Sequence, residues 1–136
     1  MDLVPILDRL NAGLRRITPR NELSLAAAST LTRLARSGPQ RLNALYGPEG
    51  VTQPAMTQLV ARLERDRLVT RSPDPVDGRG VVIAVTDAGR FAIFRRRAIR
   101  AAAICERMKR LSAADQDAIR AALPALNLLS DEMQCR

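Results

Sequence analysis

The sequence predicts a mainly α-helical fold that carries one small β-hairpin. Apolar residues recur at helical spacing over most of the chain, and two short β-branched segments flank a single turn-rich loop near its middle. With 46% hydrophobic and 26% charged residues, the composition is that of a folded domain and not of a disordered chain. A chain of 136 residues can also bury a core without disulfides or a structural metal.

The pattern of residues in the first half of the chain predicts four helices. Residues 2–17 carry leucines at helical spacing, and residues 24–36 begin at Ser24, whose hydroxyl can cap a helix. A short third helix is predicted over residues 39–46. A fourth is predicted over residues 52–67, where Thr52 is a suitable N-cap and Pro54 lies in the first turn.

The pattern then changes to short strands and returns to helices. Residues 68–71 and 81–86 predict a β-hairpin around a loop rich in Pro, Asp and Gly. Two further helices are predicted over residues 87–110 and from residue 113 to about 133. On the first of these we expect Arg96 and Arg100 on the exposed side, opposite an apolar stripe formed by Phe91, Phe94, Ala98, Ala102 and Cys105.

A short helix, a turn, a longer helix and a hairpin follow one another over residues 41–85. This order is that of a winged helix-turn-helix, so the predicted fold class is mainly α with a small β-hairpin in that arrangement. On the longer helix, one face is apolar because Met56, Leu59, Val60 and Leu63 recur at helical spacing. The opposite face is polar, small or basic and holds Pro54, Gln58, Ala61 and Arg65, flanked by Thr57 and Arg62.

This polar face has the chemistry that a DNA major groove requires. Gln53 and Gln58 can address adenine, Arg62 can address guanine or a phosphate, and Ala55 can contact a thymine methyl group. A helix face that is merely solvated would show the same pattern. At the hairpin tip, Arg79 stands between two glycines and suits a narrow minor groove, or it forms a turn arginine paired to Asp74 or Asp77.

Composition narrows the class of function. The formal charge of +8, from 22 basic and 14 acidic residues, favours an anionic partner, nucleic acid first and anionic lipid second. The chain has no His, its cysteines, Cys105 and Cys135, form no metal motif, and no Gly-rich phosphate loop follows a strand. We therefore expect no enzyme activity, no metal and no cofactor. We also expect no membrane segment and a cytoplasmic location, because the sequence shows neither an apolar span nor a signal peptide.

The positive charge is unevenly placed. Residues 41–86 carry a net charge of only +1, whereas residues 87–110 carry +6. The four arginines Arg95, Arg96, Arg97 and Arg100 could be solvated, contact the DNA backbone, hold an anionic ligand or pair across a dimer, and the sequence does not choose. We expect Cys105 to be buried and unreactive, and the Tyr46 ring to pack with its hydroxyl near the surface.

From about Leu23 to its end, the chain resembles the multiple-antibiotic-resistance regulator (MarR) family. The most specific motif is Asp-Pro-x-Asp-x-Arg at residues 74–79, followed by a strand that ends in Thr-x-x-Gly-Arg at residues 86–90. Residues 51–60 and 63–71 are similar to the family's recognition helix and to the strand that follows it. The chain departs from the family at Gly78, where a basic residue is common.

The resemblance implies a homodimer that binds a pseudo-palindromic operator in double-stranded DNA. It implies that the fold includes a helical dimerisation region, with residues 1–22 and 91–136 dimerising around a DNA-binding region at 23–90. It further implies a repressor released by a small aromatic or anionic effector. The helix at residues 52–67 would read the major groove and the wing arginine, Arg79, would enter the minor groove, while Arg71 would tie the wing to the body or meet a phosphate.

Two sets of site residues follow. The expected DNA-binding residues are Thr52, Gln53, Pro54, Ala55, Thr57, Gln58, Arg62, Arg65, Arg71 and Arg79. The expected dimerisation residues are Leu3, Leu7, Leu10, Leu126, Leu129 and Met133. The alternative functions are a winged-helix protein-interaction module and a small-molecule-binding protein that reads no specific operator.

Overall fold

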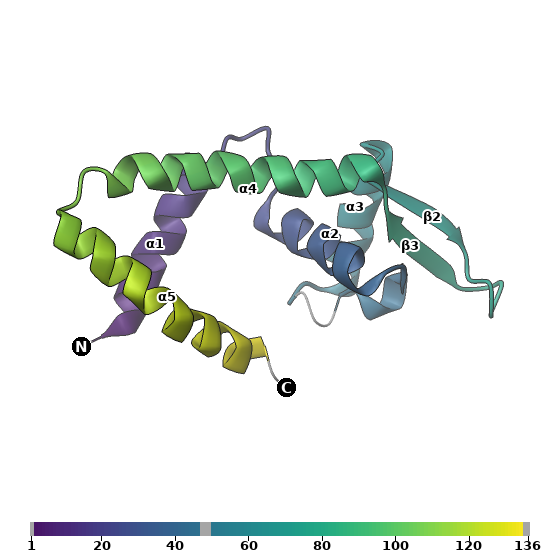
Figure 1. The fold of residues 1–136 in the computed structure, drawn as a ribbon. Coiled ribbons are helices and arrows are strands. Elements are labelled where there is room, and N and C mark those ends of the chain that lie inside the picture. Colours follow the sequence, from purple (N-terminus) through teal and green to yellow (C-terminus); the bar gives the residue numbers. More distant parts are fainter. Residues whose placement is uncertain (1, 47–49, 135–136) are drawn as a thin grey trace. The chain divides into compact units, whose positions relative to one another are not determined.

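The computed structural model describes residues 2–46 and 50–134 of the chain (Figure 1). Cys135 therefore lies outside the described residues. The chain divides within one long helix into two units, residues up to Arg100 and residues from Ala101 onward.

The first unit contains most of the secondary structure. Its elements in chain order are α1 (Leu3–Ile17), α2 (Leu25–Ser37), β1 (Gln40–Arg41), the 3-10 turn η1 (Leu42–Ala44), α3 (Gln53–Arg65), β2 (Val69–Pro73), β3 (Val81–Val85) and the first half of α4 (Asp87–Met108). The second unit contains the rest of α4 and α5 (Ala113–Gln134). The predicted fold class, mainly α with a winged helix-turn-helix, is confirmed.

Side-chain caps start the helices where the sequence predicts them. The hydroxyl of Ser24 accepts the N–H of Ala27 at 3.2 Å, and that of Thr52 accepts the N–H of Ala55 at 3.4 Å. The Ser112 hydroxyl accepts the N–H of Asp115 at 3.1 Å and donates to its carboxylate at 2.6 Å, so Ser112 caps α5 and the Asp115 side chain holds the capping hydroxyl. Local sequence thus determines where these helices begin.

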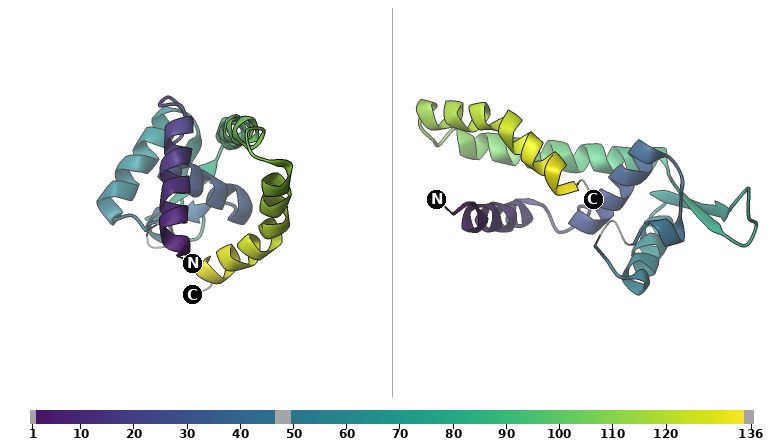
Figure 2. Two further views of the ribbon diagram at one scale, coloured as in Figure 1. Left: turned by 90° about the vertical axis from the view of Figure 1, so that its left-hand side faces the viewer. Right: turned by 90° about the horizontal axis from the view of Figure 1, so that it is seen from below.

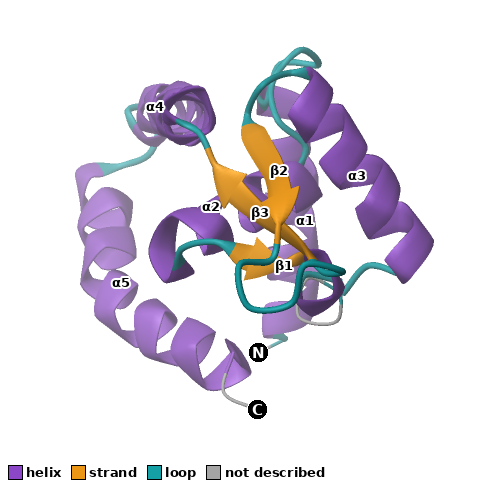
Figure 3. Cartoon of the chain, turned by 90° about the vertical axis from the view of Figure 1, so that its right-hand side faces the viewer, coloured by secondary structure: helices purple, strands orange, loops and turns teal. Residues whose placement is uncertain are grey.

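The three strands form one antiparallel sheet in the order β1-β3-β2 (Figure 3). β2 pairs with β3 from Val69 opposite Val85 to Pro73 opposite Val81, and the hairpin formed by these two strands and their loop is called the wing below. The wing extends beyond the helices of the first unit (Figure 2). The short strand β1 covers the other edge of β3, where Gln40 lies opposite Ile83.

The core of the first unit lies between α2, α3 and the sheet. Its fully buried apolar side chains are Leu31, Leu34, Leu45, Met56, Val60 and Ile83. The half-buried ring of Tyr46 packs against this core, in agreement with the prediction for that residue. In contrast, α1 and α5 contain no buried residue within the single chain.

The prediction of a helix over residues 39–46 is wrong. Gln40 and Arg41 instead form β1, because their backbone pairs with the free edge of β3 at Ile83 and Val82. The single turn η1 follows β1 within the described residues up to Tyr46. A long-range pairing that no local pattern reveals thus replaces most of a helix.

The predicted orientation of α4 is also wrong. The buried residues of α4 are Gly89, Ile93 and Arg96, whereas Phe91 and Phe94 are 63% and 68% exposed. Arg96, expected on the exposed side, is only 9% exposed, and Cys105, expected to be buried, is exposed. The buried residues follow one another at spacings of four and three, so they form one helical stripe that begins at Gly89.

A close backbone contact explains why that stripe faces inward. A Cβ atom on Gly89 would lie 2.3 Å from the carbonyl oxygen of Leu68. The same carbonyl accepts the N–H of Thr86 at 3.0 Å, and the Thr86 hydroxyl donates to the carbonyl of Arg67 at 2.7 Å. These contacts join the end of α3, the base of the wing and the start of α4, and they orient α4 with Gly89 against the body.

The end of α3 at this junction has a left-handed backbone. Arg67 has a φ of 60°, a conformation that usually requires Gly. Two hydrogen bonds that are typical of a Schellman motif hold it, from the N–H of Arg67 to the carbonyl of Glu64 and from the N–H of Leu68 to the carbonyl of Leu63. The junction therefore tolerates a non-glycine residue at a strained position.

Asp74 closes the far end of the wing. Its N–H donates to the carbonyl of Gly80 at 2.9 Å, and its carboxylate accepts the N–H of Val76 at 2.9 Å. The same carboxylate lies 2.6 Å from the Nε of Arg41, although the Asp74 side chain is only 5% exposed. The Val76 hydrogen bond and then the Arg41 charge lower the pKa of Asp74, against the opposing effect of its burial.

We predict that Gly89→Ala destabilises the protein by about 1–3 kcal/mol, because the new methyl group has no room beside the Leu68 carbonyl. Urea unfolding at one protein concentration measures this. Gly78→Ala is the matched control, since no atom lies within 4 Å of the place that its new methyl group would take. Equal unfolding free energies for the two variants would contradict the role of the close contact.

We predict that Asp74→Asn flattens the acid limb of the stability profile. A carboxylate whose folded-state pKa is depressed stabilises the fold above its unfolded-state pKa of about 4, and this stabilisation is lost as the pH falls through the folded-state value. The parent should thus lose more stability than the variant as the pH falls from about 6 to about 3, and urea titrations at each pH measure the difference. Asp66→Asn, at an exposed carboxylate, is the control, and parallel profiles for parent and Asp74→Asn would disprove the assignment.

Candidate nucleic-acid interface

The α3 helix presents the predicted polar face to solvent. Its buried residues are Met56, Leu59, Val60 and Leu63, the apolar set that the sequence predicts. The expected DNA-binding residues of this helix and its cap are all exposed: Thr52, Gln53, Pro54, Ala55, Thr57, Gln58, Arg62 and Arg65. The rotation of α3 about its axis is therefore as predicted.

Not every polar side chain on this face is free to bind DNA. The Thr52 hydroxyl caps the helix, and the Thr57 hydroxyl donates to the carbonyl of Gln53 at 2.9 Å. The side-chain hydrogen bonds and ion pairs formed by described residues do not involve Gln58 or Arg62. Gln58 and Arg62 are thus long polar groups of α3 with no competing internal partner in the described part of the chain.

The wing arginine is also unengaged. The backbone N–H of Arg79 donates to the Asp77 carboxylate at 3.1 Å, and the side chain of Arg79 is exposed. The alternative, a turn arginine paired to Asp74 or Asp77, is not observed among the described residues: Asp74 pairs with Arg41, and Asp77 holds the backbone of the loop. The loop thus presents the Arg79 guanidinium to solvent.

Arg71 connects the wing to α3. Its Nε lies 3.0 Å from the Glu64 carboxylate, and both side chains are partly exposed. An exposed pair of this kind contributes little to stability, about 0–1 kcal/mol. Its effect is geometric, since it joins β2 to the helix that carries the polar face. This contact fits the first of the two roles that the family resemblance implies for Arg71.

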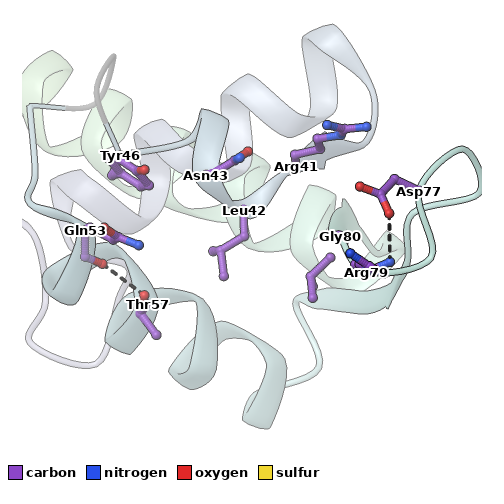
Figure 4. A pocket seen from close by; sticks show the side chains of 10 residues that line it. Arg41, Leu42, Asn43, Tyr46, Gln53, Thr57, Asp77, Arg79 and Gly80 are labelled. Carbon is purple, nitrogen blue, oxygen red and sulfur yellow. Dashed lines mark hydrogen bonds between the residues drawn. The ribbon is translucent and has the colours of Figure 1, made fainter.

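A hollow of about 300 Å³ lies between α3 and the wing (Figure 4). Its lining residues come from three places: Arg41, Leu42, Asn43 and Tyr46 from β1, η1 and the turn after it, Gln53 and Thr57 from α3, and Asp77, Arg79, Gly80 and Val81 from the wing. The sequence-based prediction missed the first group, because it assigned residues 39–46 to a helix. The sequence carries little signal for this group, since Arg41, Asn43 and Tyr46 alternate with the apolar residues Leu42, Ala44 and Leu45.

The arginines of α4 have mostly internal partners. Arg95 lies 2.9 Å from the Glu22 carboxylate, and the Nε of Arg96 donates to the carbonyl of Leu23 at 3.0 Å. Burial, together with the charge of Arg100, lowers the pKa of Arg96. Arg95 and Arg96 therefore hold the linker between α1 and α2 against α4. Of the four arginines whose role the sequence leaves open, these two have partners within the chain.

Residues 2–46 and 50–134 hold neither a metal cluster nor a membrane span. No group of three or more Cys, Asp or Glu side chains among them is placed to hold a metal ion. None of the described helices combines the length and the apolar character that a membrane span requires.

Comparisons with known proteins agree with this geometry. The MarR family model matches residues 23–81. An HTH-type transcriptional regulator of Mycobacterium bovis is 34% identical over 131 residues, which cover 96% of this chain and 92% of the relative. A transcriptional regulator of Thermotoga maritima has a similar structure, with a TM-score of 0.72 at 25% identity over 98% of this chain and 95% of that one.

The structure of Bordetella bronchiseptica BpsR, whose DNA binding is regulated by 6-hydroxynicotinic acid, is similar in fold. Its TM-score is 0.65 at 22% identity over 92% of this chain and 89% of that chain. The matching family and the curated relatives are transcriptional regulators and not enzymes. With its winged helix-turn-helix, its hairpin signature and these relatives, the chain belongs to the MarR family of transcriptional regulators.

Proposed function

We propose that the chain is a cytoplasmic repressor that binds a pseudo-palindromic operator as a homodimer. One observation carries the operator assignment: Gln58 and Arg62 on α3 and Arg79 on the wing are exposed polar groups with no internal partner among the described residues. The α3 side chains have donors and acceptors that match base edges in the major groove. Arg79 on a projecting loop matches the electronegative minor groove beside it.

Exposed leucines support the homodimer. Leu3, Leu7 and Leu10 on α1 are 40–58% exposed in the single chain, and Leu126, Leu129 and Met133 on α5 are 40–75% exposed. Large apolar side chains exposed along whole helices mark an interaction surface. A second copy of the chain is the partner that gives each half of a palindrome its own α3 and wing.

An anionic or aromatic effector is a further part of the proposal. BpsR, which shares the fold, responds to 6-hydroxynicotinic acid, a small aromatic acid. In the first unit of this chain, the half-buried Arg100 lies close enough to Arg96 to lower its pKa, and Arg96 itself is 9% exposed. Because Arg96 is engaged with the Leu23 carbonyl, Arg100 is the guanidinium of this pair that is placed to meet a carboxylate ligand.

We predict that Gln58→Ala relaxes sequence preference and that Arg79→Ala weakens binding with a smaller salt dependence. Loss of a bidentate base contact costs about 1–3 kcal/mol per half-site, and loss of one cationic contact lowers the salt slope by about one per subunit. The measurement is binding to a duplex selected from a random library, at several salt concentrations.

Arg107→Ala is the matched control for the removal of charge. This side chain donates to the carbonyl of Ala103 within its own helix, at 2.8 Å. Selection of no palindromic duplex by the parent chain would exclude the proposed function and favour a protein-interaction module. Unchanged binding by both Gln58→Ala and Arg79→Ala would refute the residue assignments alone.

We predict that Leu126→Glu shifts the chain from dimer to monomer, because the substitution places a carboxylate in an apolar interface. Sedimentation equilibrium measures the mass directly. Leu25→Glu is the control, since Leu25 is 62% exposed at the start of α2, outside the two helices in question. A parent that sediments as a monomer, or a Leu126→Glu variant that stays dimeric, would count against the proposed interface.

A further inference from the structure

The hollow beside α3 has a polar wall that the predicted DNA-binding set does not include. Asn43 and Tyr46 line it farther from the wing than Arg41, which lies beside Asp77 (Figure 4). Asn43 is exposed and Tyr46 is half-buried. Among the described lining residues, the Thr57 hydroxyl donates to the Gln53 carbonyl, the Asp77 carboxylate accepts the N–H of Arg79, and Arg41 pairs with Asp74. The Asn43 amide and the Tyr46 hydroxyl therefore have no such bond there.

The place of the hollow in the fold predicts which part of the DNA it would meet. If α3 occupies a major groove and Arg79 the adjacent minor groove, one sugar–phosphate backbone must pass between them, because a strand separates neighbouring grooves. The hollow lies between these two elements, with Gln53 and Thr57 on one side and Arg79 and Gly80 on the other. No other DNA component fits this place.

We infer that the hollow seats the DNA backbone between the two grooves and that Asn43 and Tyr46 donate hydrogen bonds to its phosphates. This inference rests on the proposed function and extends it to two residues and one ligand group. An amide N–H and a phenolic O–H are good donors to phosphate oxygens. Such contacts set the register of the protein on the duplex, and they carry no base preference of their own.

The charges around the hollow explain why neutral donors are needed there. Arg41 and Arg79 bring positive charge, but Arg41 is paired with Asp74 at 2.6 Å and the Asp77 carboxylate also lines the hollow. The net attraction for a phosphate is therefore modest, and hydrogen bonds from Asn43 and Tyr46 must supply the local affinity. Removal of such a neutral donor should weaken binding without a change in the salt slope, unlike removal of Arg79.

The test places a single methylphosphonate, which lacks one charged oxygen, at each phosphate of the selected duplex in turn. For the parent chain, we expect one or two adjacent positions per half-site, between the α3 and Arg79 contacts, to lose about ten-fold in affinity, the value for a hydrogen bond to a charged group. In Asn43→Ala and in Tyr46→Phe, a methylphosphonate at the phosphate that the removed side chain contacts should cost only about two-fold, because the donor to that phosphate is already absent.

Asn21→Ala is the matched control, as Asn21 is exposed in the linker between α1 and α2 and does not line the hollow. It should show the parent pattern. The inference is overturned if no backbone position between the two contacts is sensitive in the parent, or if both variants lose the same factor as the parent. Those outcomes leave the proposed function intact, whereas failure to select any duplex overturns both. The parent scan decides the question even if one variant fails to fold.

Discussion

The contact between Gly89 and the carbonyl of Leu68 determines the geometry of the whole DNA-binding part. That carbonyl also accepts the N–H of Thr86, so one peptide group meets both the base of the wing and the first turn of α4. Because only a residue without a Cβ can approach so closely, the face of α4 that carries Gly89 is the one that packs against Leu68. The Gly of the Thr-x-x-Gly-Arg motif thus has a packing reason in this chain.

A second anchor lies at the opposite end of the sheet. The Asp74 carboxylate holds the wing loop through Val76 and joins it to β1 through Arg41. With one end of the wing bonded to the α3 terminus and the other to β1, the distance between α3 and Arg79 is set by hydrogen bonds at both ends. In the proposed DNA complex this distance has to match the separation of a major groove and the adjacent minor groove, so these hydrogen bonds serve the proposed function.

The parts predicted correctly depend on local chemistry. The α3 helix begins at a capping hydroxyl and repeats its apolar residues within one helix, and its buried face is the predicted one. The parts predicted wrongly depend on partners distant in sequence. Residues 40 and 41 become a strand because β3 has a free edge, and α4 turns Phe91 outward because Gly89 must face Leu68.

The residues of the candidate site also fall into those that local sequence predicts and those that it does not. Gln58, Arg62 and Arg79 could be chosen from helical spacing and from a loop motif. Asn43 and Tyr46 could not, since their place beside α3 exists only once β1 is paired with β3. The sequence thus reveals the proposed DNA-binding groups that lie on one element, but not the proposed groups that depend on the packing of β1, α3 and the wing.

Net charge is a poor guide to how this chain recognises DNA. In the strongly basic segment at 87–110, Arg95 pairs with the Glu22 carboxylate and Arg96 donates to the carbonyl of Leu23. These two arginines therefore hold the α1–α2 linker. The segment at 41–86, which contains α3 and the wing, has a formal charge of only +1. A charge of +8 over the whole chain attracts any polyanion at long range. Discrimination between DNA sequences has to come from the few uncharged and cationic groups whose positions the two anchors determine, because a diffuse field is the same for every sequence.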